Sequence, residues 1–181
     1  AFKGVDVAIQ NSGGLRADLT AGIVRREDIH SVSPFENRLL LLEMNGAELR
    51  RLFQIGSSGA HGIMQVSGAS YHFDDTITEG VDIDANGSID TWEQDRLCAL
   101  SVAGTPVTED QKYRVAVTDF LYGGGDHLAP AFEGVNIVEE GPLLRDHLTS
   151  AFGRKQSCLD KSPLIDPKWP RVKIGPCDQG E

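Results

Sequence analysis

The amino-acid sequence predicts an α+β domain, with a mixed sheet and flanking helices. Segments with strand patterns and segments with helical spacing alternate along the 181 residues, but without the regular strand–helix–strand rhythm of a parallel α/β sheet. The length fits one domain of roughly 100–200 residues. Hydrophobic residues make up 40% of the chain, which is ordinary for a globular protein. We therefore expect a single domain over residues 1–181.

Residues 1–55 are expected to contain two strands and two helices. Residues 5–10 form a buried strand that ends in a turn at 11–14, where two glycines permit backbone angles that other residues avoid. Residues 26–32 suit a short helix, since a proline follows closely. Four consecutive leucines within 38–44 are typical of a central strand, and the apolar spacing over 47–55 predicts a helix.

The chain from residue 71 onward is expected to contain two strands and one helix. Tyr71 and Phe73 alternate with polar neighbours, as do the apolar residues of 114–118, so both segments favour strands. A helix is predicted from Gly141-Pro142 through residue 152, because the apolar residues there share one side. Residues 153–181 are expected to form an irregular tail.

Charge and hydropathy exclude two classes of partner. The chain holds 17 Lys and Arg against 27 Asp and Glu, a formal net charge of −10, which disfavours binding of a nucleic-acid polymer. No apolar run approaches the roughly 18 residues of a membrane helix. The chain begins at Ala1 and enters a strand almost at once, so we expect it to be part of a longer protein.

The three cysteines leave two interpretations open. A disulfide between Cys158 and Cys177 would pin the tail and suit an exported protein, whereas a cytosolic chain would keep reduced thiols. Cys98 lies in an apolar stretch and is expected to be a small buried hydrophobe.

Residues 82–93 match the twelve-position calcium loop of EF-hands. Glycine stands at position 6, an apolar residue at position 8 and glutamate at position 12. The expected ligands are Asp82, Asp84, Asn86, Ser88 through its carbonyl, Asp90 through a water, and Glu93. A solvated acidic turn is the alternative, since Asp, Asn and Gly also form turns. The preceding residues 75–81 lack helical periodicity, so we expect an inserted structural Ca²⁺ site rather than a sensor.

Three further segments have chemistry suited to a ligand. Residues 11–16 (Asn-Ser-Gly-Gly-Leu-Arg) place an amide, a glycine turn and a guanidinium after a buried strand, which can cradle an anion or another polar ligand. Residues 33–37 put an aromatic ring in a rigid turn. Residues 119–127 combine two aromatics with three glycines, a pattern expected where a group approaches the backbone closely. For residues 33–37 the alternative is that the ring packs in the core. For residues 119–127 the alternative is a flexible surface loop.

Taken in order, these motifs resemble the C-terminal domain of the 5′-nucleotidase family, which also contains UDP-sugar hydrolases and cyclic-nucleotide phosphodiesterases. The resemblance covers Asp6 to about Phe132. It rests on Asn11-Ser12-Gly13-Gly14-Leu15-Arg16, Pro34-Phe35-Glu36-Asn37, Asn45-Gly46-Ala47-Glu48-Leu49, Val66-Ser67-Gly68, Tyr113-Arg114-Val115-Ala116 and Phe120 with Gly124-Gly125-Asp126.

The resemblance implies a substrate-recognition domain of a nucleotide phosphohydrolase. Phe35 and Phe120 would sandwich the base, Asp126 would accept hydrogen bonds from the ribose hydroxyls, and Asn11 and Arg16 would reach toward the phosphate. The implied substrate-binding residues are Asn11, Gly13, Gly14, Arg16, Phe35, Phe120, Gly124, Gly125 and Asp126.

The resemblance also implies a partner domain and a location. Hydrolysis would take place at two divalent metals in an N-terminal metallophosphoesterase domain of the same polypeptide, absent from this chain, so the fragment alone is expected to be inactive. A periplasmic, cell-surface or extracellular location follows. Two alternatives stay open: a calcium-dependent binding or adhesion module without catalysis, and a sulfur-oxidation hydrolase on the same scaffold.

Overall fold

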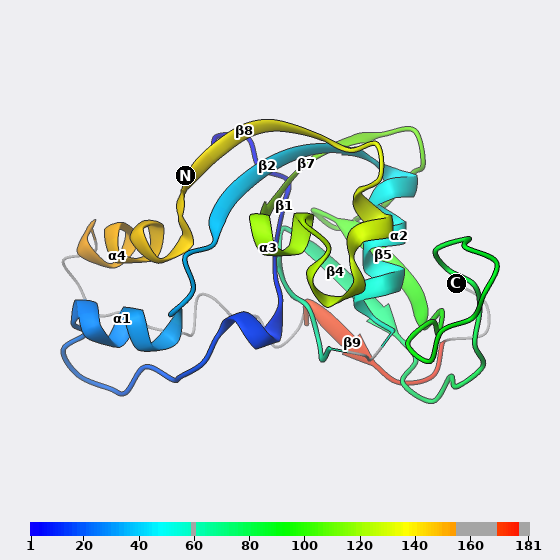
Figure 1. Cartoon of the computed structure of the whole chain (residues 1–181), viewed down its shortest axis with the longest axis horizontal. Coiled ribbons are helices and arrows are strands. Elements are labelled where there is room, and N and C mark those ends of the chain that lie inside the picture. The colour runs from blue at the N-terminus through cyan, green and yellow to red at the C-terminus, as the bar shows by residue number, and fades with distance from the viewer. Residues whose placement is uncertain (59–60, 155–169, 178–181) are drawn as a thin grey trace.

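The computed structural model describes residues 1–58, 61–154 and 170–177. Two sheets dominate these residues, and the expected α+β class with flanking helices is confirmed (Figure 1). The first sheet has the strand order β3-β1-β7-β2-β8 and consists of β1 (Val7–Gln10), β2 (Arg38–Asn45), β3 (Gln65–Ser67), β7 (Lys112–Thr118) and β8 (Asn136–Leu143). The second has the order β6-β5-β4-β9 and consists of β4 (Ala69–Phe73), β5 (Leu97–Val102), β6 (Thr105–Pro106) and β9 (Val172–Ile174).

The first sheet is mixed, and its pairing decides which loops meet. Strand β1 runs parallel to β7, with Val7 opposite Val115. Strand β2 runs antiparallel to β7, with Leu39 opposite Thr118. The carboxyl ends of β1 and β7 and the amino end of β2 therefore lie at one edge of the sheet.

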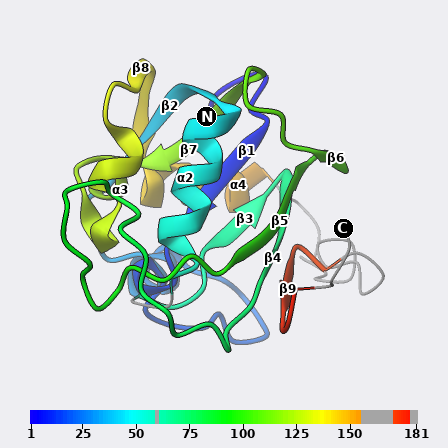
Figure 2. The same cartoon turned by 90° about the vertical axis from the view of Figure 1, so that its right-hand side faces the viewer.

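Helix α2 (Gly46–Gly56) lies across the first sheet with β4 and β5 beside it (Figure 2). It begins at a capping box: the side chain of Asn45 accepts from the Glu48 N–H at 2.9 Å, and the Glu48 carboxylate accepts from the Asn45 N–H at 2.7 Å. Its apolar face, which includes the fully buried Leu52 and Phe53, packs into the core with the inward residues of β1, β2 and β7. Burial of this face is what holds the helix on the sheet.

The other helices follow the ends of strands. Helix α1 (Arg26–Val32) has the predicted bounds and lies beside α4 (Leu144–Arg154) at one end of the molecule (Figure 1). Helix α3 (Asp119–Tyr122) directly follows β7. Three short 3₁₀ turns cover Ser12–Gly14, Gly125–His127 and Ala129–Phe132.

The predicted start of the last helix at Gly141-Pro142 is wrong. Both residues belong to β8, and α4 begins at Leu144. Strand β8 is the edge strand next to β2, and a proline is tolerated at an edge because it has no N–H to donate. The strand is mostly exposed, so its sequence lacks the apolar alternation that would have indicated it.

The cysteine interpretations also need correction. Cys177 is bonded to Cys98 across 79 residues, with a Cα–Cα distance of 5.5 Å, so it does not pair with Cys158 and Cys98 is not a free buried thiol. The physical reason is strand β9, which pairs parallel to β4 with Val172 opposite Tyr71 and so carries Cys177 to the start of β5. Cys158 lies outside the described residues.

The tail predicted to be irregular over residues 153–181 contains regular structure where it is described. Residues 153 and 154 end α4, and Val172–Ile174 form β9. The remainder at 155–169 and 178–181 lies outside the described residues. Within the described part of the chain, none of the helices combines the length and apolar character needed to cross a bilayer.

The disulfide gives the first prediction. Cys98→Ser should lower the free energy of unfolding by roughly 2–4 kcal/mol, because a bridge over a long loop restricts the unfolded chain. Chemical denaturation of the oxidised proteins measures this, and Cys158→Ser is the matched control, expected to stay near the parent value. An equal loss in the control, or peptide mapping that joins Cys158 to Cys177, would contradict the pairing.

The carboxylate of Asp74 gives a prediction on pH. It accepts hydrogen bonds from the Thr76 hydroxyl at 2.6 Å, the Thr76 N–H at 2.9 Å and the Cys177 N–H at 3.4 Å. The hydrogen bonds from Thr76, and then that from Cys177, hold the pKa of Asp74 below its ordinary value against the opposing effect of burial.

A carboxyl whose pKa is lower in the folded state stabilises the fold above its unfolded pKa of about 3.9, and the contribution disappears as the pH falls through the folded pKa. Asp74→Asn should therefore destabilise the protein at pH 6, and its deficit should shrink as the pH falls below about 4. Thermal melting at several pH values measures the deficit, with the exposed neighbour Asp75→Asn as control. A deficit that stays constant from pH 6 to pH 3 would refute the assignment.

Candidate functional site

The segment after β1 forms a tight polar turn. The N–H groups of Gly14 and Leu15 donate to the carbonyls of Asn11 and Ser12. Gly14 is buried, and a Cβ there would collide with the side chains of Gln10 and Asn11. The missing side chain thus leaves room for Gln10 Nε2 to donate to Asn11 Oδ1 at 3.0 Å. This glycine is required by close packing of its neighbours.

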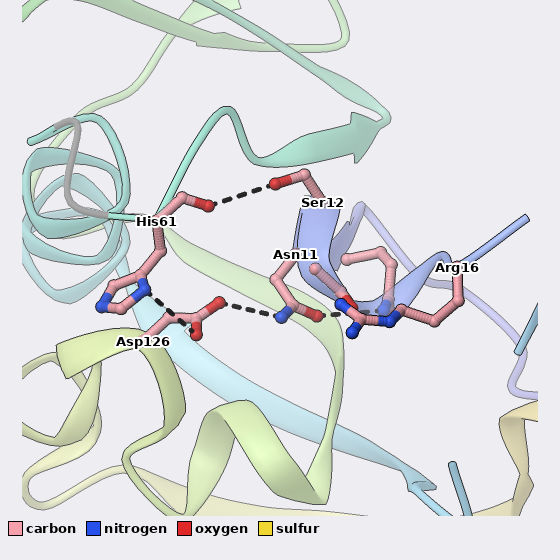
Figure 3. Close-up of polar contacts among 7 residues, drawn as sticks. Asn11, Ser12, Arg16, His61 and Asp126 are labelled. Carbon is pink, nitrogen blue, oxygen red and sulfur yellow. Dashed lines mark hydrogen bonds and ion pairs between the residues drawn. The ribbon is translucent and has the colours of Figure 1, made fainter. Parts of the chain in front are cut away.

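Asn11 and Asp126, 115 residues apart in sequence, are in direct contact. Asn11 Nδ2 donates to Asp126 Oδ2 at 2.8 Å, and the Asn11 side chain is held in place by Gln10 (Figure 3). On the opposite side of the carboxylate, Asp126 Oδ1 lies 3.7 Å from His61 Nδ1 (Figure 3). Asn11 is 7% exposed, whereas the Asp126 side chain keeps 19% of its surface in solvent. The carboxylate is therefore oriented by the protein and still reachable by a ligand.

The backbone around Asp126 is held in an uncommon conformation. Asp126 and His127 both have left-handed backbone angles, with φ of 57° and 63°. Non-glycine residues adopt this region rarely and at some cost in energy, and such residues concentrate at functional sites. The strain fixes the direction in which both side chains leave the turn.

Of the three glycines before Asp126, Gly125 makes room for the ring of Phe120. A Cβ on Gly125 would occupy the space of the Phe120 ring, and Gly124 has a φ of 97° that favours glycine. The group that approaches the glycine backbone is thus the ring of α3. The Phe120 side chain is 44% exposed, so part of the ring remains in solvent.

Phe35 and Arg16 form a second part of this region. The Arg16 guanidinium lies 5.9 Å from the centre of the Phe35 ring, within the range of a cation–π contact, and the ring is 42% exposed. Arg16 Nη1 also donates to the Gly13 carbonyl at 3.3 Å (Figure 3). Phe35 comes shortly before β2 and Phe120 shortly after β7, so both leave the sheet at the edge where Asn11 lies.

The sequence did not indicate a cluster of rings beside Asp126. The His127 imidazole stacks on the Trp92 indole with centroids 4.9 Å apart and planes 2° apart. The His61 ring lies 4.7 Å from the His127 ring on another side. These residues come from three loops that are distant in sequence, so no spacing rule connects them.

The acidic loop at residues 82–93 brings three carboxylates together. One oxygen from each of Asp82, Asp84 and Glu93 lies within 4.8 Å of the others. Ca²⁺ binds oxygen at 2.3–2.6 Å, so this spacing permits one cation to contact all three. Asp90 is not part of this group among the described residues.

The local hydrogen bonds give the loop its shape. The Asp82 carboxylate accepts from the N–H groups of Asn86 at 3.1 Å and Gly87 at 2.9 Å, and Asn86 Oδ1 accepts from Ser88 N–H at 2.8 Å. Gly87 at position 6 has a φ of 86°, the sharp turn that the pattern predicts. Residues 75–81 and 94–96 form no helix, so the site lacks the helix pair of an EF-hand.

Glu93 is the buried member of the loop. Its carboxylate is fully buried and accepts from the N–H groups of Ile83, Asp84 and Asp90 at 2.8, 3.1 and 2.7 Å. Burial alone would raise the pKa of Glu93, but the hydrogen bonds from Asp90, Asp84 and Ile83 hold that pKa below its ordinary value. The side chain is therefore anionic at neutral pH, as a calcium ligand must be.

Comparison with known proteins gives matches in sequence over most of the chain. The family model described as "5′-nucleotidase, C-terminal domain" matches residues 1–134. The cell wall protein Lmo0130 of Listeria monocytogenes is 37% identical over 141 residues, which cover 74% of this chain and 16% of that protein. The NAD 5′-nucleotidase of Haemophilus influenzae is 28% identical, over 75% of this chain and 24% of that protein.

A solved structure extends the likeness of the fold. The 5′-nucleotidase precursor from Thermus thermophilus matches with a TM-score of 0.72 at 23% identity, over 95% of this chain and 32% of that one. The chain thus spans between a sixth and a third of the length of these relatives.

Proposed function

Since the chain belongs to the family of 5′-nucleotidase C-terminal domains, we propose that it recognises the nucleoside part of a nucleotide for a phosphohydrolase. The observation that carries the proposal is the contact between Asn11 and Asp126, which joins two motifs 115 residues apart at one edge of the sheet. An oriented, partly exposed carboxylate suits the two hydroxyls of a ribose, because a charged acceptor makes strong hydrogen bonds.

The base is proposed to stack on Phe35 and Phe120. Both rings are exposed to a similar extent, 42% and 44%, at the edge of the sheet that carries Asp126. A flat aromatic base placed there would bury apolar surface that now faces solvent. Stacking tolerates every base, so the proposal covers purine and pyrimidine nucleotides.

The reaction itself is proposed to take place outside this chain. The chain spans 16% and 24% of the two curated relatives, which leaves room for a metallophosphoesterase domain in the same polypeptide. Two divalent metals there would activate water and stabilise charge on the phosphate. In this chain, Gly13 and Gly14 supply the narrow turn, and Arg16 supplies a positive charge beside Phe35.

We also propose that residues 82–93 bind a structural Ca²⁺. The donors fit a hard cation: three grouped carboxylates, one of them fully buried, and a glycine with positive φ at position 6. Without flanking helices, the ion would hold a long connection between β4 and β5 in place.

An exported or cell-surface location is proposed as well. A cell wall protein is among the relatives, and the Cys98–Cys177 disulfide suits an oxidising compartment. The same disulfide ties down the connection that carries the candidate calcium loop, since Cys98 lies near the start of β5.

The nucleoside proposal predicts binding of adenosine by the 181-residue chain. Phe35→Ala and Phe120→Ala should each weaken that binding about tenfold, since stacking on an aromatic side chain contributes about 1–3 kcal/mol per base. Isothermal titration calorimetry measures the affinity. Ile23→Ala, which removes an apolar side chain that is 82% exposed, is the control and should change nothing. The proposal would be refuted if adenosine did not bind, or if Ile23→Ala weakened its binding as much as the two Phe variants do.

The calcium proposal predicts a shift in thermal stability. Ca²⁺ at 100 times its dissociation constant should stabilise the chain by about 2.7 kcal/mol, which raises Tm by about 5–10 °C for a protein of this size. Glu93→Gln and Asp82→Asn should abolish the shift, whereas Glu79→Gln, an exposed acid beside the loop, should keep it. A melting curve that chelation leaves unchanged would remove the claim.

A further inference from the structure

A polar pocket lies next to Asp126, outside the residues that the proposed function uses. It has a volume of about 390 Å³ and is lined by His61, Trp92, Gln94, Arg96, His127 and two hydroxyl residues. Among the described residues that line it, none is acidic, although the chain as a whole has a net charge of −10. The pocket combines one guanidinium with two imidazoles, and its lining therefore differs in charge from the acidic average of the chain. We call it the basic pocket.

The side chains of residues 91–96 leave the backbone in different directions, which explains why the pocket lacks carboxylates. Trp92, Gln94 and Arg96 line it, whereas the residues between them turn elsewhere. Glu93 accepts hydrogen bonds within the calcium loop, and Asp95 accepts from Gln54 at 2.9 Å. This segment therefore separates its basic and acidic groups.

Arg96 is anchored by its backbone and by one nitrogen. Its Nε donates to the Ile77 carbonyl at 2.9 Å, and its carbonyl accepts from Asp74 N–H at 2.9 Å. Its two terminal nitrogens make no hydrogen bond or ion pair with the described residues. The fork of N–H donors is thus held at the pocket and left available, the arrangement that suits a phosphate or carboxylate.

The other wall of the pocket is equally ordered. Trp92 packs against the hydrophobic core and stacks on His127, whose backbone is fixed at a φ of 63°. His127 directly follows Asp126, and His61 lines both the basic pocket and the small crevice that Asn11 and Asp126 share. A group attached to a ribose held by Asp126 would therefore reach the basic pocket.

We propose that the basic pocket is a subsite for a phosphate carried on a ribose hydroxyl, so that the chain prefers nucleotides with a phosphate on the 2′ or 3′ side. This rests on the proposed function, because it places the ribose at Asp126. One hydroxyl stays free to donate to the carboxylate, while the phosphate on the other meets Arg96 and the imidazoles. A metal cation is disfavoured there, since the guanidinium carries a permanent positive charge.

Calorimetry with four probes tests the subsite in the 181-residue chain: adenosine, adenosine 3′-monophosphate, adenosine 5′-monophosphate and inorganic phosphate. The 3′-monophosphate should bind about tenfold more tightly than adenosine, as expected for charge-assisted hydrogen bonds. Arg96→Gln and His127→Gln should each remove most of the tenfold difference in affinity between the 3′-monophosphate and adenosine. Arg50→Gln makes the same charge change at an exposed position of α2 and should preserve it. Melting temperatures check that every variant folds.

The outcomes separate this inference from the proposed function. If adenosine binds and the 3′-phosphate adds no affinity, the subsite is wrong and the nucleoside site stands. A third outcome is that the 5′-monophosphate binds as much more tightly than adenosine as the 3′-monophosphate does, with Arg96→Gln lowering both affinities equally. In that case the pocket does not select a phosphate on the 2′ or 3′ hydroxyl, and the inference fails. If no nucleoside binds, the proposed function fails. Inorganic phosphate then decides the pocket: binding that Arg96→Gln removes supports an anion site, and no binding overturns it.

Discussion

The parallel pairing of β1 with β7, beside antiparallel β2, is the constraint on which the arrangement of the site depends. It brings the end of β1, the end of β7 and the start of β2 to one edge of the sheet. Asn11 follows the first of these strands, Phe120 and Asp126 follow the second, and Phe35 precedes the third. The strand pairing therefore brings three loops from different parts of the chain together. The hydrogen bond from Asn11 to Asp126 then fixes one precise geometry within that frame.

Much of the fold could be predicted because its signals are local. A nearby proline indicates the end of α1, apolar spacing indicates α2, and the apolar runs of β1, β2 and β7 indicate buried strands. Two of the strands that escaped prediction, β8 and β9, are held by pairing rather than by their own composition. Strand β8 is exposed and contains Pro142, and β9 is three residues long and stabilised by β4 and a disulfide.

The site was predictable to the extent that one segment carried several of its residues. The glycines after β1 and before Asp126 indicated close approach, and the structure shows that Gly14 and Gly125 make room for neighbouring side chains. His61, Trp92 and Arg96 carried no such signal. Each looks unremarkable in its own segment, and only long-range folding brings them to one pocket. The same reason made the partner of Cys177 unreadable, since 79 residues separate it from Cys98.

The net charge of −10 describes no single surface of the molecule, because acidic and basic groups are separated within a few residues. Glu93 turns into the acidic loop at residues 82–93, while its neighbours Trp92 and Gln94 turn to the basic pocket. The two surfaces share one backbone segment, so an ion that orders the loop would also limit the movement of the pocket wall. A rigid wall loses little conformational entropy when a ligand binds. In this way an acidic chain can present a local site for an anion, and the acidic loop beside it would contribute order to that site if it binds the proposed ion.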